Sequence, residues 1–305
     1  EEKNEILINK HWGIVGRLND FTDYLEWKPK LIEIHLTWRD LVNFDKEKST
    51  VKSKSYDQDF VVHAPEYYKD RLIDFTTSNS DVLEYSFEML QRTIELARGM
   101  APQFSGMKNE KGPKIVLHPG GHSEARVETH KTEQYKTLAK NLREIDTDGV
   151  ELLIENMPPN PWYFGGQWYN SVFLDPSEIE QFCKDTGFGT CYDTSHALLH
   201  CNFAKQTLNN FTKKISKHVR HLHISDGAGT TQEGLQLGNG NLDFDHLFEI
   251  FQTIDSGFIP EIWQGHLNNG NGFYKALKTI QDLLDSKLST PGCSSNHKSD
   301  ACMAG

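Results

Sequence analysis

Residues that can act as acids, bases and metal ligands recur in this chain at one kind of position, the C-terminal end of a short apolar segment. They are His63 in VVHAP, His118 in KIVLHPGG, Glu155 in ELLIEN, Asp193 and His196 in CYDTSH, His223 and Asp226 in HLHISD, and Glu261 in IPEIW. Any one of them alone could be a hydrogen-bonded structural residue. Their shared position in successive segments favours one common site.

A site that collects these side chains would need a cation. Several carboxylates and imidazoles cannot share a poorly hydrated cavity without mutual repulsion unless a positive charge offsets them. Mixed nitrogen and oxygen ligands suit transition metals better than Ca²⁺. The sequence therefore predicts a divalent metal, Mn²⁺ or Zn²⁺ in the first place, with Co²⁺, Fe²⁺ and Mg²⁺ as alternatives.

The elements that must position these residues are short apolar strands alternating with longer amphipathic helices, which is typical of a parallel α/β protein. We expect strands at residues 7–15, 31–36, 60–63, 114–118, 150–155, 189–193, 219–224 and 258–263. We expect helices at residues 21–27, 81–100, 125–145, 176–185, 202–217, 244–254 and 272–288, with none clear after the second strand. Asp175 followed by Pro176 is a strong start signal for one of them.

This pattern predicts a single-domain (β/α)8 barrel, a TIM barrel, over residues 1–288. In such a barrel the C-terminal ends of all strands open at one mouth, so residues distant in sequence become neighbours. A doubly wound open sheet would use the same elements, but no GxGxxG follows the first strand and the polar residues do not gather at one switch point. Residues 289–305 lack apolar periodicity and are predicted to form a flexible tail, which contains Cys293, His297 and Cys302.

Composition restricts the partners. The formal net charge of −11 and the pI near 5.7 disfavour nucleic acid. A mean hydropathy of −0.59 and the lack of a long apolar run argue against a membrane span. The five cysteines form no CxxC pair, which is typical of reduced, cytoplasmic proteins. A homo-oligomer, or one domain of a longer chain, is compatible with all of this.

Two features bear on the substrate. Tryptophans near strand ends suit the C–H faces of a sugar, and Trp263 and Trp38 are the candidates, although core packing is the alternative role. The glycine-rich loop at 227–241 follows the seventh predicted strand, where barrels often bind phosphate through backbone N–H groups. A flexible lid is the alternative role of this loop.

The motifs HAP, HPGG, LLIEN, CYDTSH, HLHISD, LGNGNLDF and PEIW, in this order over residues 61–263, resemble the xylose isomerase-like barrel superfamily. This superfamily contains sugar phosphate isomerases and epimerases and the abasic-site endonucleases that use three zinc ions. The resemblance implies that Glu155, Asp193, His223 and Glu261 hold one metal, and that Glu155 and Glu261 also act as acid and base. His196 would then contact the substrate, or orient Asp193.

The resemblance further implies that His63 and His118, with Glu155 as a bridge, hold a second metal, as in the nuclease branch; otherwise they contact substrate. The third zinc of the nucleases needs an Asp and a His where this chain has Glu233 and Leu235. That departure disfavours phosphodiester cleavage. Gly229 also stands where related epimerases often have an arginine, which weakens the match to one particular keto-sugar epimerase.

The leading hypothesis is a metal-dependent isomerase or epimerase that acts on a sugar, sugar acid or sugar phosphate by proton transfer through an enediolate. The alternatives are a lyase that dehydrates a related polyol-like acid, a phosphoesterase or abasic-site endonuclease, and a barrel module without catalytic activity. The residues alone do not separate the isomerase or epimerase from the lyase, because both reactions pass through the same enediolate.

Overall fold

The structure is a computed structural model that describes residues 5–44, 55–107, 111–126 and 130–289. Its centre is one parallel eight-stranded sheet in the order β1-β2-β3-β6-β8-β12-β13-β16. The strands are β1 (Gly13–Gly16), β2 (Leu31–His35), β3 (Asp59–His63), β6 (Lys114–Leu117), β8 (Glu151–Glu155), β12 (Gly189–Asp193), β13 (Val219–Ile224) and β16 (Gly257–Pro260). An isolated parallel bridge between Trp12 and Phe258 joins the two ends of the sheet. The result is the expected (β/α)8 barrel.

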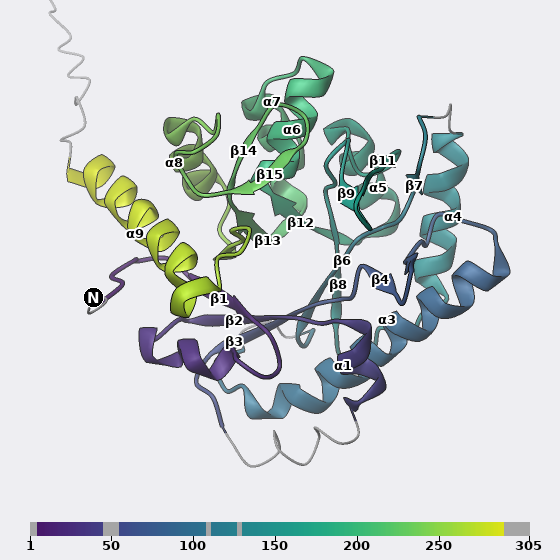
Figure 1. The fold of residues 1–305 in the computed structure, drawn as a ribbon, viewed down its shortest axis with the longest axis horizontal. Helices are drawn as coiled ribbons and strands as arrows, with labels where there is room; N and C mark the ends of the chain where they lie inside the picture. The colour runs from purple at the N-terminus through teal and green to yellow at the C-terminus, as the bar shows by residue number, and fades with distance from the viewer. Residues whose placement is uncertain (1–4, 45–54, 108–110, 127–129, 290–305) are drawn as a thin grey trace, which may run out of the picture.

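The strands are apolar because both of their faces are covered. One face lines the barrel interior and the other packs against helices, so Ile14, Ile32, Ile34 and Val62 are all fully buried. Figure 1 shows the strands at the centre and the helices around them. Polar side chains interrupt this apolar core on β2 and at the strand ends, where Glu33 and Glu155 are buried as well.

The covering elements are η1 (Phe21–Trp27), α1 (Trp38–Val42), α3 (Ser80–Met100), η2 (Ala101–Gln103), α4 (Lys131–Arg143), α5 (Pro176–Thr186), α6 (Thr194–Ala204), α7 (Leu208–Ile215), η3 (Ser216–His218), α8 (Phe244–Thr253) and α9 (Leu267–Ser289). Within α9, the left-handed backbone at Asn268, Asn269 and Gly270 breaks the helix directly after its first residue, Leu267. The start signal at Asp175 is confirmed, because its Oδ1 accepts hydrogen bonds from the N–H groups of Ser177 and Glu178.

Several element boundaries differ from the sequence expectation. The first strand begins at Gly13 rather than at residue 7, because in the segment 5–12 Trp12 alone pairs with a strand, through an isolated bridge. The predicted helix 202–217 is two helices, separated where Lys205 adopts a left-handed conformation and Thr207 caps α7. A short helix, α1, does follow the second strand. The predicted tail falls almost wholly on residues 290–305, outside the described residues.

The described part of the chain also forms four small two-stranded sheets outside the barrel. They pair β4 (Tyr67–Tyr68) with β5 (Arg71–Leu72), β7 (His122–Ser123) with β11 (Tyr169–Asn170), β9 (Trp162–Tyr163) with β10 (Gly166–Gln167), and β14 (Asp226–Ala228) with β15 (Gln232–Leu235). They follow the C-terminal ends of β3, β6, β8 and β13, and so lie at the mouth of the barrel. None of the described helices is long and apolar enough to cross a membrane.

Candidate active site and metal centre

The mouth of the barrel contains a cavity of about 670 Å³. Its lining includes most of the predicted site residues: His118, Glu155, Asp193, His196, Glu261 and Trp263. Glu155 and Asp193 are each only 1% exposed, whereas Trp263 is 75% exposed. The cavity therefore places buried acid and base groups beneath a solvent-accessible opening.

The expected four-residue set converges. Glu155, Asp193, His223 and Glu261 each direct one donor atom into a common space in which all of these atoms lie within 4.8 Å of one another. Nδ1 of His223 lies 2.7 Å from Oε2 of Glu261 and 3.4 Å from Oε1 of Glu155. These four residues come from β8, β12, β13 and the segment just after β16, so it is the barrel that assembles them.

The donor set fits a divalent cation. Nδ1 of His223 is buried and makes no hydrogen bond of good geometry, although three carboxylates surround it and Oε2 of Glu261 lies 2.7 Å away. A buried ring nitrogen without a partner costs free energy unless something else occupies its lone pair. Three carboxylates and one imidazole are ligands that Mn²⁺ and Zn²⁺ accept.

The electrostatics of this cluster are strongly perturbed. Burial raises the pKa of Asp193 to about 6, against the opposing effect of His196. Burial would also raise the pKa of Glu261, but the adjacent His223 ring lowers it to about 2. For Glu155, burial acts to raise the pKa, but His223 together with hydrogen bonds from His118 and His196 lowers the pKa well below its usual range. Such perturbed carboxyl groups are frequent in functional sites.

A second group lies on the other side of Glu155. Nε2 of His63 and Nε2 of His118 lie 3.1 Å and 3.2 Å from Oε2 of Glu155. Donor atoms of these three residues also lie within 4.8 Å of one another. Glu155 therefore presents Oε1 to the four-residue set and Oε2 to His63 and His118, which is the arrangement of a bridging carboxylate.

His196 contacts both the four-residue set and the cavity. Its Nδ1 bonds to the backbone oxygen of Asn156 at 2.9 Å and lies 3.3 Å from Oε1 of Glu155, and its Nε2 lies 3.4 Å from Oε2 of Glu233. The backbone N–H of His196 also donates to Oδ1 of Asp193 at 2.6 Å, because Asp193 caps α6. His196 is thus in contact with Asp193 and also lines the cavity.

The two predicted tryptophans have different positions. Trp263 lines the cavity and is 75% exposed. Trp38 does not line it: the ring lies edge-on to Tyr68 at 5.6 Å and packs against the hydrophobic core. Trp38 is the first residue of α1 rather than part of a strand end.

The glycine-rich loop is tied to a carboxylate. Asp226 is fully buried and accepts hydrogen bonds from the N–H groups of Gly227, Gly238, Gly240 and Leu242, at 2.8–3.0 Å. These backbone donors, which a phosphate group would require, are therefore already used. At Gly240, an added Cβ would lie 2.4 Å from Oδ1 of Asp226, so this close approach requires glycine.

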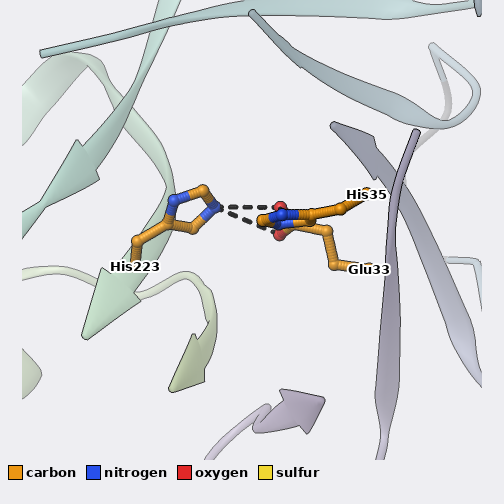
Figure 2. Close-up of side chains that lie close together, drawn as sticks. All are labelled: Glu33, His35 and His223. Atoms are coloured by element: carbon orange, nitrogen blue, oxygen red, sulfur yellow. Dashed lines mark hydrogen bonds and ion pairs between the residues drawn. The ribbon is translucent and has the colours of Figure 1, made fainter. Parts of the chain in front are cut away.

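Three polar residues near the site were not expected: Glu33 and His35 on β2, and His221 on β13. Glu33 and His221 are fully buried, and His35 lines the cavity. The signal was present in the segment LIEIH, where a charged residue interrupts an apolar strand and shares its face with a histidine two positions later. Figure 2 shows Glu33 beside the rings of His35 and His223.

Comparisons with known proteins agree with the barrel fold. A probable endonuclease 4 of Bacillus velezensis is 25% identical over 236 residues, which cover 72% of this chain and 70% of the relative. The structure of an L-ribulose 3-epimerase superposes with a TM-score of 0.65 at 17% identity, covering 95% of this chain and 100% of the other. A Thermus thermophilus protein soaked with ZnCl2 has a TM-score of 0.63 at 18% identity, with 90% and 98% covered. The family model described as xylose isomerase-like TIM barrel matches residues 27–283, and this chain therefore belongs to that family.

Proposed function

We propose that the protein is a divalent-metal-dependent isomerase or epimerase that transfers a proton on a sugar or sugar acid. The observation that carries this proposal is the pair of glutamates, Glu155 and Glu261, that both approach Nδ1 of His223 beside the cavity. Glu155, Asp193, His223 and Glu261 would hold the cation. When bound, such a cation polarises a carbonyl oxygen and so acidifies the neighbouring C–H group.

The acid and base chemistry belongs to the two carboxylates. One glutamate removes the proton from the carbon beside the carbonyl, and the other returns a proton from the opposite side. His196 is placed to bind a substrate oxygen, because it lines the cavity with its Nε2 beside Glu233. Glu155 is held by contacts from His63, His118 and His196, so its position is fixed before substrate arrives.

The cavity favours a substrate without phosphate. Among the described residues that line it, Arg17 is the only lysine or arginine, and its Nη1 donates to the backbone oxygen of His35 at 3.0 Å. The same lining contains Asp20, Glu66 and Glu233 besides the metal-site carboxylates. A dianionic phosphate would meet this negative charge with little compensation, whereas a neutral sugar could stack on Trp263.

An isotope experiment tests the proposal. The protein, loaded with Mn²⁺ or Zn²⁺, is incubated in D₂O with a panel of ketoses, sugar acids and their phosphates, and the products are examined by NMR. We expect deuterium at the carbon next to the carbonyl, and faster exchange with the unphosphorylated members. Absence of exchange with every member, or isomerisation that retains the original hydrogen, would refute proton transfer. Loss of water with formation of a double bond would instead assign the lyase alternative.

A hydrolase of phosphodiesters is the second candidate, because His63, His118 and Glu155 provide a second set of converging donors. The endonuclease relative also means that the acidic composition does not suffice to exclude nucleic acid. Glu233 and Leu235 still occupy the positions expected to supply a third zinc site, and leucine offers no donor atom. Cleavage of a duplex with one abasic site, at physiological salt and with added Zn²⁺, decides this question; we expect the duplex to remain intact.

A further inference from the structure

Glu33 is a buried carboxylate shared by three histidines. Oε1 of Glu33 lies 2.9 Å from Nε2 of His35 and 3.0 Å from Nε2 of His223, and Oε2 is in close contact with Nε2 of His221. The side chains of Glu33, His221 and His223 are all 0% exposed. The barrel brings β2 and β13 together across its interior, so this cluster crosses from one strand to the other (Figure 2), and its member His35 lines the cavity.

The contacts determine which ring nitrogens carry a proton. A carboxylate only accepts hydrogen bonds, so each imidazole nitrogen that bonds to Glu33 must be an N–H group. A neutral imidazole has one N–H group, and its other nitrogen then carries a lone pair. With Nε2 protonated, His223 therefore presents the lone pair of Nδ1, which is the atom near Glu155 and Glu261.

The same reasoning applies to His35. Its Nε2 bonds to Glu33, and its Nδ1 lies 3.9 Å from Oε1 of Glu261. The ring centroid lies 4.5 Å from that of His63, and His35 lines the cavity. With Nε2 protonated, Nδ1 of His35 offers a lone pair beside the proposed cation, available to the ion, to its water or to a substrate hydroxyl.

We propose that Glu33 is the positioning residue of the metal centre: it holds His223 and His35 in the Nε2–H tautomer, so that both rings turn an Nδ1 lone pair toward the cavity. His35 thereby becomes a further functional group of the site. This inference rests on the metal site proposed above. A carboxylate that fixes the tautomer of a ligating histidine typically changes metal affinity about 10–100-fold when it is lost.

Glutamine at position 33 would have a specific effect. It keeps the size of the side chain but replaces one acceptor oxygen with an NH₂ donor. Nε2 of His223 lies 3.0 Å and 3.2 Å from the two oxygens of Glu33, so in either orientation that donor would face the Nε2–H group of His223, and this ring must change its tautomer or turn away. We expect the Glu33→Gln variant to fold and to bind Zn²⁺ about 10–100-fold more weakly. Glu151→Gln is the matched control, because Glu151 begins β8 at the opposite end of the barrel from the mouth.

The experiment has two measurements. The zinc-loaded wild-type protein, labelled with ¹⁵N, is examined by long-range ¹H–¹⁵N correlation spectra, which distinguish protonated, unprotonated and metal-bound ring nitrogens. A His35→Gln variant assigns the His35 signals. Zinc affinity of the wild type, Glu33→Gln and Glu151→Gln is measured by competition with a chromophoric chelator, and circular dichroism reports folding.

We expect Nε2 of both His35 and His223 to be protonated, Nδ1 of His223 to be bound to zinc, and Glu151→Gln to bind zinc as the wild type does. A protonated Nδ1 on either ring would overturn the proposal, and so would zinc bound at Nε2, which would make Glu33, His35 and His223 a metal site instead. A folded Glu33→Gln protein with wild-type affinity would overturn only the role of Glu33. If Glu33→Gln does not fold, the wild-type spectra decide. A wild type that binds no zinc would overturn the metal site and this inference together.

Discussion

Nε2 of His63 lies 3.1 Å from Oε2 of Glu155, while Nδ1 of His63 bonds to the backbone oxygen of Ala64 at 2.9 Å. Because the carbonyl oxygen only accepts, Nδ1 carries the proton, and a neutral ring would turn the lone pair of Nε2 toward a carboxylate oxygen. A positive charge must lie between these two atoms. In the metal-free protein it is a proton: although burial opposes it, the Glu155 carboxylate raises the pKa of His63 to about 9.

The first prediction concerns a second metal position, formed by His63, His118 and Glu155. We expect His63→Gln to lose one equivalent of bound metal and to keep the equivalent held by the four-residue set, because His63 contacts only one oxygen of Glu155. Metal content is measured by mass spectrometry after dialysis. His130→Gln on the exposed surface is the control. Equal metal content in the wild type and the His63→Gln variant would contradict a second metal position at His63.

The second prediction separates the two glutamates. Glu155→Gln should weaken binding at both positions, since its two oxygens face different groups, whereas Glu261→Gln should affect only the position at His223. Loss of either acid or base should lower kcat about 10²–10⁴-fold. Metal content and deuterium exchange are measured in parallel, with Glu88→Gln on α3 as the control. Normal exchange in both variants would exclude the proposed acid and base roles.

The third prediction is a pH dependence of stability. The folded protein holds the His63 proton more tightly than an unfolded chain does, because the pKa rises from 6.5 to about 9. The resulting stabilisation is complete below pH 6.5 and disappears as the pH rises through 9. The pKa of His196 is raised as well: burial acts to lower it, but Asp193 and Glu155 outweigh that effect. We therefore expect the Tm of the metal-free protein to decrease as the pH rises from about 7 to about 9.

Bound metal should oppose this decrease in Tm, since protons and cations compete for the same lone pairs. The difference in Tm between metal-loaded and metal-free protein should widen as the pH rises over the same interval. Calorimetric scans at fixed ionic strength measure both. A difference that stays constant or narrows would contradict a cation held by these histidines.

The fourth prediction concerns the barrel seam. Phe258 is fully buried, and its backbone forms the bridge to Trp12 that joins β16 to the segment before β1. Phe258→Ala should lower the free energy of unfolding by about 3–5 kcal/mol, as expected for a large buried aromatic side chain. Leu7→Ala is the control. Leu7 is 65% exposed, so its truncation should change the free energy of unfolding by less than about 0.5 kcal/mol. Denaturant titration measures both, and equal effects would argue against a tightly packed seam.

The boundaries that were predicted well have local causes. The helix at Pro176 follows a capping aspartate and a proline, and both signals act within a few residues. The start of α6 was missed, because Asp193 ends β12 and caps the next helix without any loop residue. One residue there serves the strand, the helix and the proposed metal site, and the sequence does not reveal that overlap.

The loop at 227–241 shows a different limit. Its glycines predicted a phosphate cradle or a lid, and the structure shows that Asp226 binds its backbone N–H groups instead. Asp226 precedes Gly238 and Gly240 by more than ten residues, so nothing local in the sequence connects them. The hydrogen bonds form only because the β14–β15 hairpin folds the loop back on itself.

Local sequence patterns were enough to specify the barrel and the end of each strand at which reactive side chains stand. Strand periodicity and the shared mouth of a parallel barrel follow from short-range pattern and from connection rules. Which atoms meet depends instead on the three-dimensional packing. Glu33 and His223 are 190 residues apart, and their contact at 3.0 Å exists because closure of the barrel brings β2 and β13 face to face across the interior. Side-chain rotamers and ring tautomers depend on such long-range contacts, which no stretch of the sequence contains.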